Sequence, residues 1–463
     1  MKRFWLVLLS LGLVLAFSAS AFALDVKFSG DFYVAGMYLD KTKLVQDTAA
    51  DGPSTAFYYQ RLRVRTDFVV SPGLTLITRF DAMERIWGGQ RSDPGKTSVT
   101  DSAGTRAENE NIAFDWAYIN YVSPIGIFEV GLMEDGRTGT VFGDSYTTSG
   151  RIRYYSIPFG PFTLKADITK VKDQSDSAVY SSTATDADDN KYGLEGVYTW
   201  KDGRAGMKVT YYDYSDNSPD PASVPAGKNY KKQYFLFTPY AVANIGPVAL
   251  QAEVNYATGK VKNYSTSTAD VDLTNLSAFL DATATFSPIY FGGTFAYISG
   301  TDPGNTGRQT GGVLNGGQDW NPCLIMFNYY DRTNWVGNLG GYGTNVANVS
   351  SATSNGGPMG TDPAAATAPG AWFGQGRIGV KPTADLDIVA SVAYASADKK
   401  PVGVLSNTFG YEVDLTGTYK ITNNLSYMLG AGYWFVGNYY KSNSDANELK
   451  NDYMVINKLT LTF

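Results

Sequence analysis

The stretch VKFSGDFYVAGMY, residues 26–38, alternates between two kinds of residue along its whole length. Its even-numbered positions, from Phe28 to Tyr38, are apolar or glycine, whereas the positions between them include Lys27 and Asp31. A period of two places successive side chains on opposite faces of a β-strand. The stretch therefore predicts a strand with one apolar face and one mixed face.

The same alternation recurs along the chain and predicts an all-β fold. Tight turns rich in Pro, Gly and Asn separate the alternating segments, at 72–73, 124–126, 158–161, 201–203, 244–247, 287–288, 382–384 and 422–424. Longer polar segments lie between these turns, at about 39–55, 87–110, 135–149, 173–190, 215–230, 259–273, 300–370, 397–408 and 438–451. This pattern of connections requires about 18 strands.

Regular alternation of short turns and long loops indicates one closed sheet. We predict a transmembrane antiparallel β-barrel of about 18 strands over residues 24–463, with short periplasmic turns and long extracellular loops. A count of 16 strands is the alternative, and a soluble sandwich or propeller is the competing fold class. Aromatic residues ten positions apart fit two interfacial girdles, as in Phe28/Tyr38, Tyr58/Phe68, Phe409/Tyr419 and Tyr453/Phe463.

Composition excludes several classes of function. The 463 residues contain no histidine and one cysteine, Cys323, which excludes a histidine-based catalytic triad, a disulfide framework and a thiolate zinc site. We therefore expect no enzyme activity, no cofactor and no metal. The formal net charge of −6 disfavours binding to nucleic acid.

The N-terminus has the layout of a secretory signal peptide. Lys2 and Arg3 precede an apolar run over 4–17, and Ala21-Phe22-Ala23 follows it. We expect residues 1–23 to be removed after Ala23. Beyond residue 23 the sequence has no apolar stretch near the roughly 18–20 residues that a membrane-spanning helix needs.

The C-terminal strand has an aromatic end. Tyr453, Val455, Leu459, Leu461 and Phe463 share one face, and this arrangement resembles the closing strand of Gram-negative outer-membrane proteins. At the level of architecture the mature chain resembles the porin superfamily. The resemblance implies a bacterial outer-membrane location in contact with the lipid bilayer, recognition of Phe463 by the barrel-assembly machinery, and a possible homotrimer.

A barrel of this width leaves room for water, so a channel is the expected function. We predict passive diffusion of small hydrophilic solutes. Porins fold a loop after the fifth strand into the lumen, and the equivalent segment here, about 135–149, contains Asp135, Arg137 and Asp144. We expect these residues at a constriction, and an ordinary external loop is the alternative.

Charged residues with inward parity predict the wall of the channel. The basic set is Arg61, Arg63, Arg65, Arg79, Arg85, Arg151 and Arg153. The acidic set on the same parity is Asp67, Asp81, Asp115 and Glu129, and a second acidic group follows at Glu195, Glu253, Asp281, Glu412 and Asp414. Two interpretations remain open and are compatible: a local anion site at Arg61, Arg63 and Arg65, or a mesh of salt bridges that stiffens the wall.

Two other functions compete with simple diffusion. A substrate-specific channel would use the long loop at 300–370, whose apolar stretch over 319–330 carries Cys323, as a lid. Tyrosines with inward parity, namely Tyr33, Tyr59, Tyr121 and Tyr212, would then line the path of a sugar. Alternatively, the barrel is a sleeve or scaffold for a partner such as a cytochrome.

Overall fold

The computed structural model describes residues 25–46, 53–88, 112–135, 138–143, 148–173, 188–216, 230–263, 270–305, 307–311, 319–337, 339–342 and 369–463. The predicted signal peptide, Arg137 and Asp144 lie outside the described residues.

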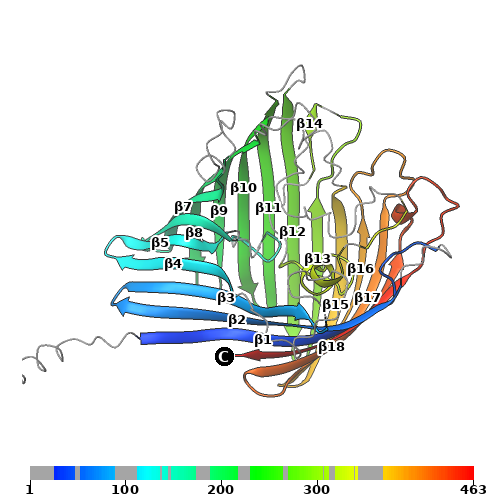
Figure 1. Ribbon diagram of the computed structural model, residues 1–463, viewed down its shortest axis with the longest axis horizontal. Coiled ribbons are helices and arrows are strands. Elements are labelled where there is room, and N and C mark those ends of the chain that lie inside the picture. The colour runs from blue at the N-terminus through cyan, green and yellow to red at the C-terminus, as the bar shows by residue number, and fades with distance from the viewer. Residues whose placement is uncertain are drawn as a thin grey trace, which may run out of the picture.

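The described strands form one closed antiparallel barrel (Figure 1). Consecutive strands pair with one another, and β1 closes the sheet by pairing with β19, where Tyr33 lies opposite Thr460. The very short strand β14 (Arg308–Gln309) pairs in parallel with β12 and is not part of the wall. The wall therefore has the 18 strands that the connections predict.

The wall strands have the following bounds: β1 Asp25–Leu39, β2 Thr55–Ser71, β3 Leu74–Ile86, β4 Ala113–Ser123, β5 Gly126–Glu134, β6 Thr148–Ser156, β7 Phe162–Lys172, β8 Asp189–Trp200, β9 Gly203–Asp216, β10 Tyr230–Ile245, β11 Val248–Asn263, β12 Val271–Phe286, β13 Ile289–Ile298, β15 Ala371–Thr383, β16 Leu386–Ser396, β17 Thr408–Lys420, β18 Leu425–Val436 and β19 Asp452–Thr462.

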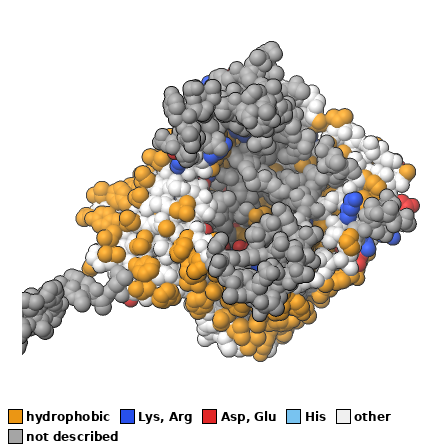
Figure 2. Space-filling model, in the orientation of Figure 1, with side chains coloured by type: hydrophobic (Ala, Val, Ile, Leu, Met, Phe, Trp, Pro, Cys, Tyr) orange, Lys and Arg blue, Asp and Glu red, His pale blue; other side chains and the backbone are white. Residues whose placement is uncertain are grey.

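The outer face of the barrel carries apolar side chains, whereas the side chains of the inner face are polar or are buried inside the barrel. On β17, Val413 and Leu415 are exposed, whereas Glu412 and Asp414, which alternate with them, are buried. Figure 2 shows hydrophobic side chains over the outer surfaces of the strands that are in view. An apolar band on the outside of a closed antiparallel sheet is the surface that a lipid bilayer requires.

The height of the wall is uneven. β5 and β6 have nine residues each, whereas β10, β11 and β12 have 16 each. In Figure 1 the green strands β10–β12 extend well beyond β4 and β5.

Two β-bulges overturn predictions based on simple parity. Ala395 pairs with Gly410 while Ser396 pairs with Thr408, so Phe409 is an extra residue that turns inward and is fully buried. Phe409 is therefore not part of an outer aromatic girdle. The bulge has glycine at position 410, with φ of +131°.

A second bulge lies in β4. Arg79 pairs with Trp116 and Phe80 pairs with Phe114, which shifts the alternation at Asp115. Trp116 and Tyr118 consequently face inward and are buried, whereas Tyr121 is exposed on the outside. The prediction that Tyr121 faces the lumen was wrong, and the tyrosine track loses one of its members.

A segment of the long loop after β13 fills part of the barrel interior. We call residues 319–337 the lumen insert; it contains a π-helical turn at Tyr329–Thr333 and a short helix, α2, at Asn334–Val336. Ile325, Met326 and Trp335 of the insert are almost completely buried in a cluster with side chains of β1, β2 and β15–β19. The apolar stretch of this loop is thus buried inside its own barrel.

None of the helices in the described part of the chain has the length and hydrophobicity needed to cross a bilayer.

Candidate functional site: the lumen

Ion pairs cover the inner wall formed by β2, β3 and β4. Arg63 binds Asp81 through two parallel hydrogen bonds of 2.7 and 2.6 Å, from Nε to Oδ1 and from Nη2 to Oδ2. Arg79 donates to Asp115 and lies 3.5 Å from the centre of the Trp116 ring. Two-pronged pairs of this kind hold both partners in fixed orientation and cancel most of their charge.

The remaining arginines of β2 are also paired. Arg65 donates to both carboxylate oxygens of Asp67, at 2.7 and 3.1 Å. Arg61 lies 3.6 Å from Asp31 and packs over the ring of Tyr33. All three arginines proposed for an anion site therefore face carboxylates.

The wall formed by β5–β9 continues the network. Arg153 donates to Glu129 at 2.6 Å, and Arg151 lies 3.0 Å from Asp167. Arg85, the last of the predicted basic residues, is buried on β3. Lys191 and Lys208 belong to the same network but were not singled out from the sequence, although they share its inward parity.

Asp135 is a buried member of this network. It pairs with Lys191 on β8 and lies 3.6 Å from Arg151 on β6. Burial alone would raise the pKa of Asp135, but the charges of Lys191 and Arg151 outweigh it and hold the pKa below its ordinary value. Asp135 therefore anchors the start of the loop after β5 to the wall.

The described part of that loop, residues 138–143, lies against β10–β12. The backbone N–H and the hydroxyl of Thr140 both donate to Oε2 of Glu253 on β11, at 2.7 and 2.8 Å. Phe142 stacks on Phe279 of β12 and meets Trp320 of the lumen insert edge-on. The loop after β5 and the lumen insert thus contact each other inside the barrel.

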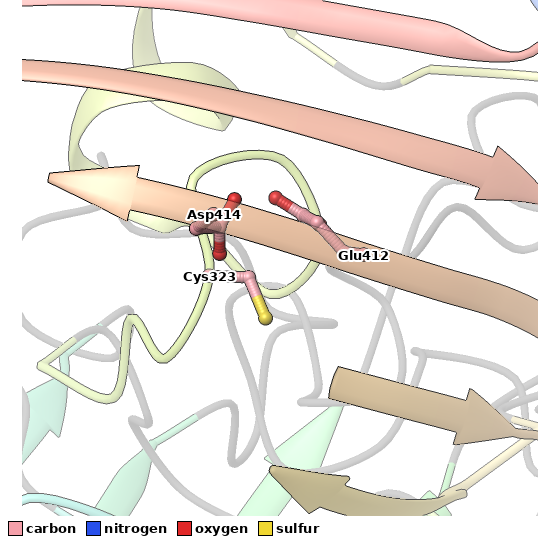
Figure 3. Close-up of side chains that lie close together, drawn as sticks. All are labelled: Cys323, Glu412 and Asp414. Carbon is pink, nitrogen blue, oxygen red and sulfur yellow. The ribbon is translucent and has the colours of Figure 1, made fainter. Parts of the chain in front are cut away.

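Wall carboxylates hold the lumen insert in place. The backbone N–H groups of Ile325 and Met326 donate to the two oxygens of Glu412 on β17, each at 2.6 Å. Figure 3 shows the side chain of Glu412 beside the loop of the insert. Asp331 of the insert accepts hydrogen bonds from Tyr59 on β2 and Lys458 on β19. The insert is therefore tied to both sides of the seam between β1 and β19.

Internal bonds keep the insert compact. Asn328 caps the π-helical turn by accepting from the N–H groups of Asp331 and Arg332. Arg332 is fully buried and donates to the carbonyl oxygens of Ile325 and Gly337. Burial lowers the pKa of this guanidinium to about 10. Its hydrogen-bonding capacity is used within the insert.

The second acidic group does not form an open acidic face. Glu195, Glu253, Glu412 and Asp414 are each buried, and the first three accept hydrogen bonds from neighbouring groups. Asp281 forms a two-pronged pair with Arg377 on β15. Each of these carboxylates is therefore either enclosed by its neighbours or paired with a cation.

A cleft opens beside the short turns of β8–β9 and β10–β11. Its volume is about 430 Å³, and its lining includes Arg204, Gln251 and Asp281. Arg204 is exposed, and its one hydrogen bond runs from Nη2 to the carbonyl oxygen of Gly139, at 3.4 Å. Among the described residues, no carboxylate pairs with Arg204, in contrast to the predicted basic set.

The structure also places Phe463 at the barrel seam. Its backbone N–H donates to the carbonyl oxygen of Gly30, and the N–H of Gly30 donates back to Phe463. The side chain of Phe463 is exposed on the outer face.

No protein-family model and no curated protein matches the chain. Among solved structures it is similar to an anion-selective porin from Comamonas acidovorans, at 11% identity over 95% of this chain and 99% of that chain, with a TM-score of 0.44. It is also similar to OpdQ of Pseudomonas aeruginosa (11% identity, 94% and 98% coverage, TM-score 0.45) and to OpdK of the same organism (10% identity, 94% and 99% coverage, TM-score 0.47). At these identities no residue role and no solute is transferred.

Closed antiparallel barrels with an apolar outer band and a polar interior reside in the bacterial outer membrane. In this chain 18 strands close such a barrel, β1 seals it against β19, and ion pairs line part of its interior. The chain therefore has the fold of a transmembrane β-barrel.

Proposed function

We propose that the chain forms a passive, water-filled channel for small hydrophilic solutes and is not an enzyme. The observation that carries this proposal is the polar inner wall of β2–β7 in a barrel too wide for wall side chains to fill. Arg63, Arg65 and Asp115 on this wall retain partial exposure. A wall of paired charges offers hydrogen bonds to a polar solute at little cost in desolvation.

The constriction is formed by two loops. We place one side of it at the segment 135–149, represented in the structure by Asp135 and residues 138–143. The other side is the lumen insert, which meets that segment through Phe142 and Trp320. Together they leave the charged wall of β2–β7 as the remaining side of the path, so small solutes pass and large ones are excluded.

Any anion preference arises from only a few groups. Arg61, Arg63 and Arg65 face Asp31, Asp81 and Asp67. They therefore contribute less positive potential to the lumen than unpaired arginines would. Arg204 near the short turns has no such partner among the described residues and is the stronger source of positive potential. The proposed selectivity is therefore a weak preference for anions.

A substrate-specific channel is the second candidate, and the buried lumen insert favours it because it narrows the pore permanently. A sleeve around a threaded partner is disfavoured by the same insert, which occupies the space a partner would need. In either channel we place the short turns in the periplasm and propose export by the signal over 1–23, assembly through Phe463 and association as a homotrimer.

The test is conductance across a planar lipid bilayer. We expect stable conductance steps from the purified mature protein and a small anion preference in the reversal potential under a salt gradient. Replacing Arg61, Arg63 and Arg65 together by Gln should change that preference little, whereas Arg204→Gln, as the matched single variant, should reduce it. A protein that inserts but passes no current would overturn the channel proposal.

A further inference from the structure

Three potential metal ligands meet where the lumen insert touches β17. One ligand atom each from Cys323, Glu412 and Asp414 lies within 4.8 Å of the others, and all three residues are buried. Figure 3 shows the carboxylates of β17 beside the loop of the insert that carries Cys323. The residues come together only through folding, since Cys323 lies far from the other two in sequence.

Among the described residues, neither carboxylate forms an ion pair within 4.0 Å, although the charge of Arg332 acts on Glu412 from farther away. Each oxygen of Glu412 accepts a backbone N–H at 2.6 Å, an arrangement that suits an ionised carboxylate. The nearby guanidinium of Arg332 donates to Ile325, Thr333 and Gly337 instead. Burying negative charge in an apolar cluster is costly unless another charge neutralises it.

Asp414 supplies a second, separate observation. Only 5% of the residue is exposed, and its Oδ1 has no hydrogen-bond partner in the described structure. The other partners of this carboxylate are the hydroxyl of Ser391, 3.5 Å from Oδ2, the backbone N–H of Leu324 and the side chain of Glu412. A buried carboxylate oxygen without a donor is a group for which a bound cation is a suitable partner.

The surrounding backbone leaves space for this arrangement. Gly432 on β18 faces the cluster, and a Cβ there would lie 2.5 Å from Oδ1 of Asp414. The same Cβ would lie 3.2 Å from the Cβ of Leu324 in the insert. Glycine at this position therefore allows the insert and the two carboxylates to approach each other.

We propose that Cys323, Glu412 and Asp414 bind one divalent transition-metal ion that fastens the lumen insert to β17. One thiolate and two carboxylates form a donor set suited to a borderline-soft ion such as Zn²⁺. Ligand bonds of about 2.0–2.3 Å require the three side chains to converge slightly from their present separation. This inference replaces the expectation of a metal-free chain and is independent of the channel proposal.

Binding of the ion releases a proton. Zinc binds cysteine as the thiolate, so the metal displaces the thiol proton when the sulfur–metal bond forms. The ion brings two positive charges to a site that then holds up to three negative ones.

The experiment uses the full mature chain, refolded with Zn²⁺ so that the enclosed site can load, and then dialysed. We expect one zinc per chain by elemental analysis and a sulfur ligand at about 2.3 Å by X-ray absorption. Cys323→Ser and Asp414→Asn should each lose the bound zinc, whereas Asp302→Asn in an exposed loop should retain it.

Folding of each variant is checked by gel electrophoresis, in which a folded barrel changes its mobility when the sample is heated. Zinc that remains bound in folded Cys323→Ser, or a folded wild type that holds no more zinc than the Cys323→Ser/Asp414→Asn double variant, would overturn the proposal. The latter result would mean that Glu412 and Asp414 share a proton instead. Neither result depends on whether the barrel conducts.

Discussion

At the scale of single residues, parity in the sequence predicted which charges face inward but not how they are used. Arg63 and Arg79 line the interior as expected, and each has a carboxylate partner on a neighbouring strand. These partners could not be identified from one sequence, because strand register decides which acid lies opposite which base.

Asp135 provides a test of the buried part of this network. Replacing Asp135 by Asn leaves Lys191 and Arg151 without their shared carboxylate in an enclosed position. We expect a loss of about 3–5 kcal/mol in the free energy of unfolding at neutral pH, measured by denaturant titration of the folded barrel. Asp67→Asn, in a more exposed pair with Arg65, should cost less than about 1 kcal/mol.

The pH dependence of this loss has a definite sign. The folded-state pKa of Asp135 is below that of an unfolded aspartate, so its stabilisation is complete above the unfolded value of about 3.9. It is lost as the pH falls through the folded-state pKa. The wild type and Asp135→Asn should therefore converge in strong acid, and a constant difference down to that range would contradict the assignment.

At the scale of elements, strands were predictable and their irregularities were not. Turn residues and period-two alternation located the wall strands, but the bulges at Gly410 and Asp115 reversed the side to which Phe409 and Tyr121 point. A bulge adds one residue to a strand without a distinctive change in composition. A prediction based on alternating positions therefore does not detect it and assigns the residues beyond it to the wrong face. The glycine at 410 was the available signal for one of them.

The lumen insert was recognisable as an apolar segment, but its location was not. Sequence alone suggested that the segment could serve as a lid over the channel. Glu412 on the wall holds the insert in place by accepting two of its backbone N–H groups. The inward parity of Glu412 predicted that it faces the lumen, but not that its hydrogen-bond donors would come from the insert. Gly432, which provides space for the insert, looked like any other strand glycine.

Glu412→Ala tests the attachment of the insert. It removes the acceptor of two buried N–H groups, each of which costs about 1–3 kcal/mol when left unsatisfied. We expect single-channel recordings to show flickering toward a larger conductance as the insert loosens. Asp385→Ala, in the exposed turn between β15 and β16, is the control. A steady wild-type conductance in Glu412→Ala would show that other contacts hold the insert.

At the scale of the whole molecule, the outer surface must match lipid. Leu415 is exposed on the outside of β17, between inward-facing Asp414 and Thr416. An arginine on the lipid-facing side costs up to about 2–4 kcal/mol near the middle of the bilayer. Leu415→Arg should therefore insert less efficiently into lipid vesicles. Val402→Arg also replaces an apolar side chain with arginine, but Val402 lies in the loop between β16 and β17. This control variant should therefore insert normally.

Arg204 lies near one rim of the barrel, so the distribution of charge along the pore differs between its two ends. Anions that approach from the short-turn end meet this cation immediately, whereas those from the other end first cross the neutralised wall. Reversing the applied voltage exchanges these two situations. The current–voltage curve of the channel should therefore bend, so that the pore rectifies.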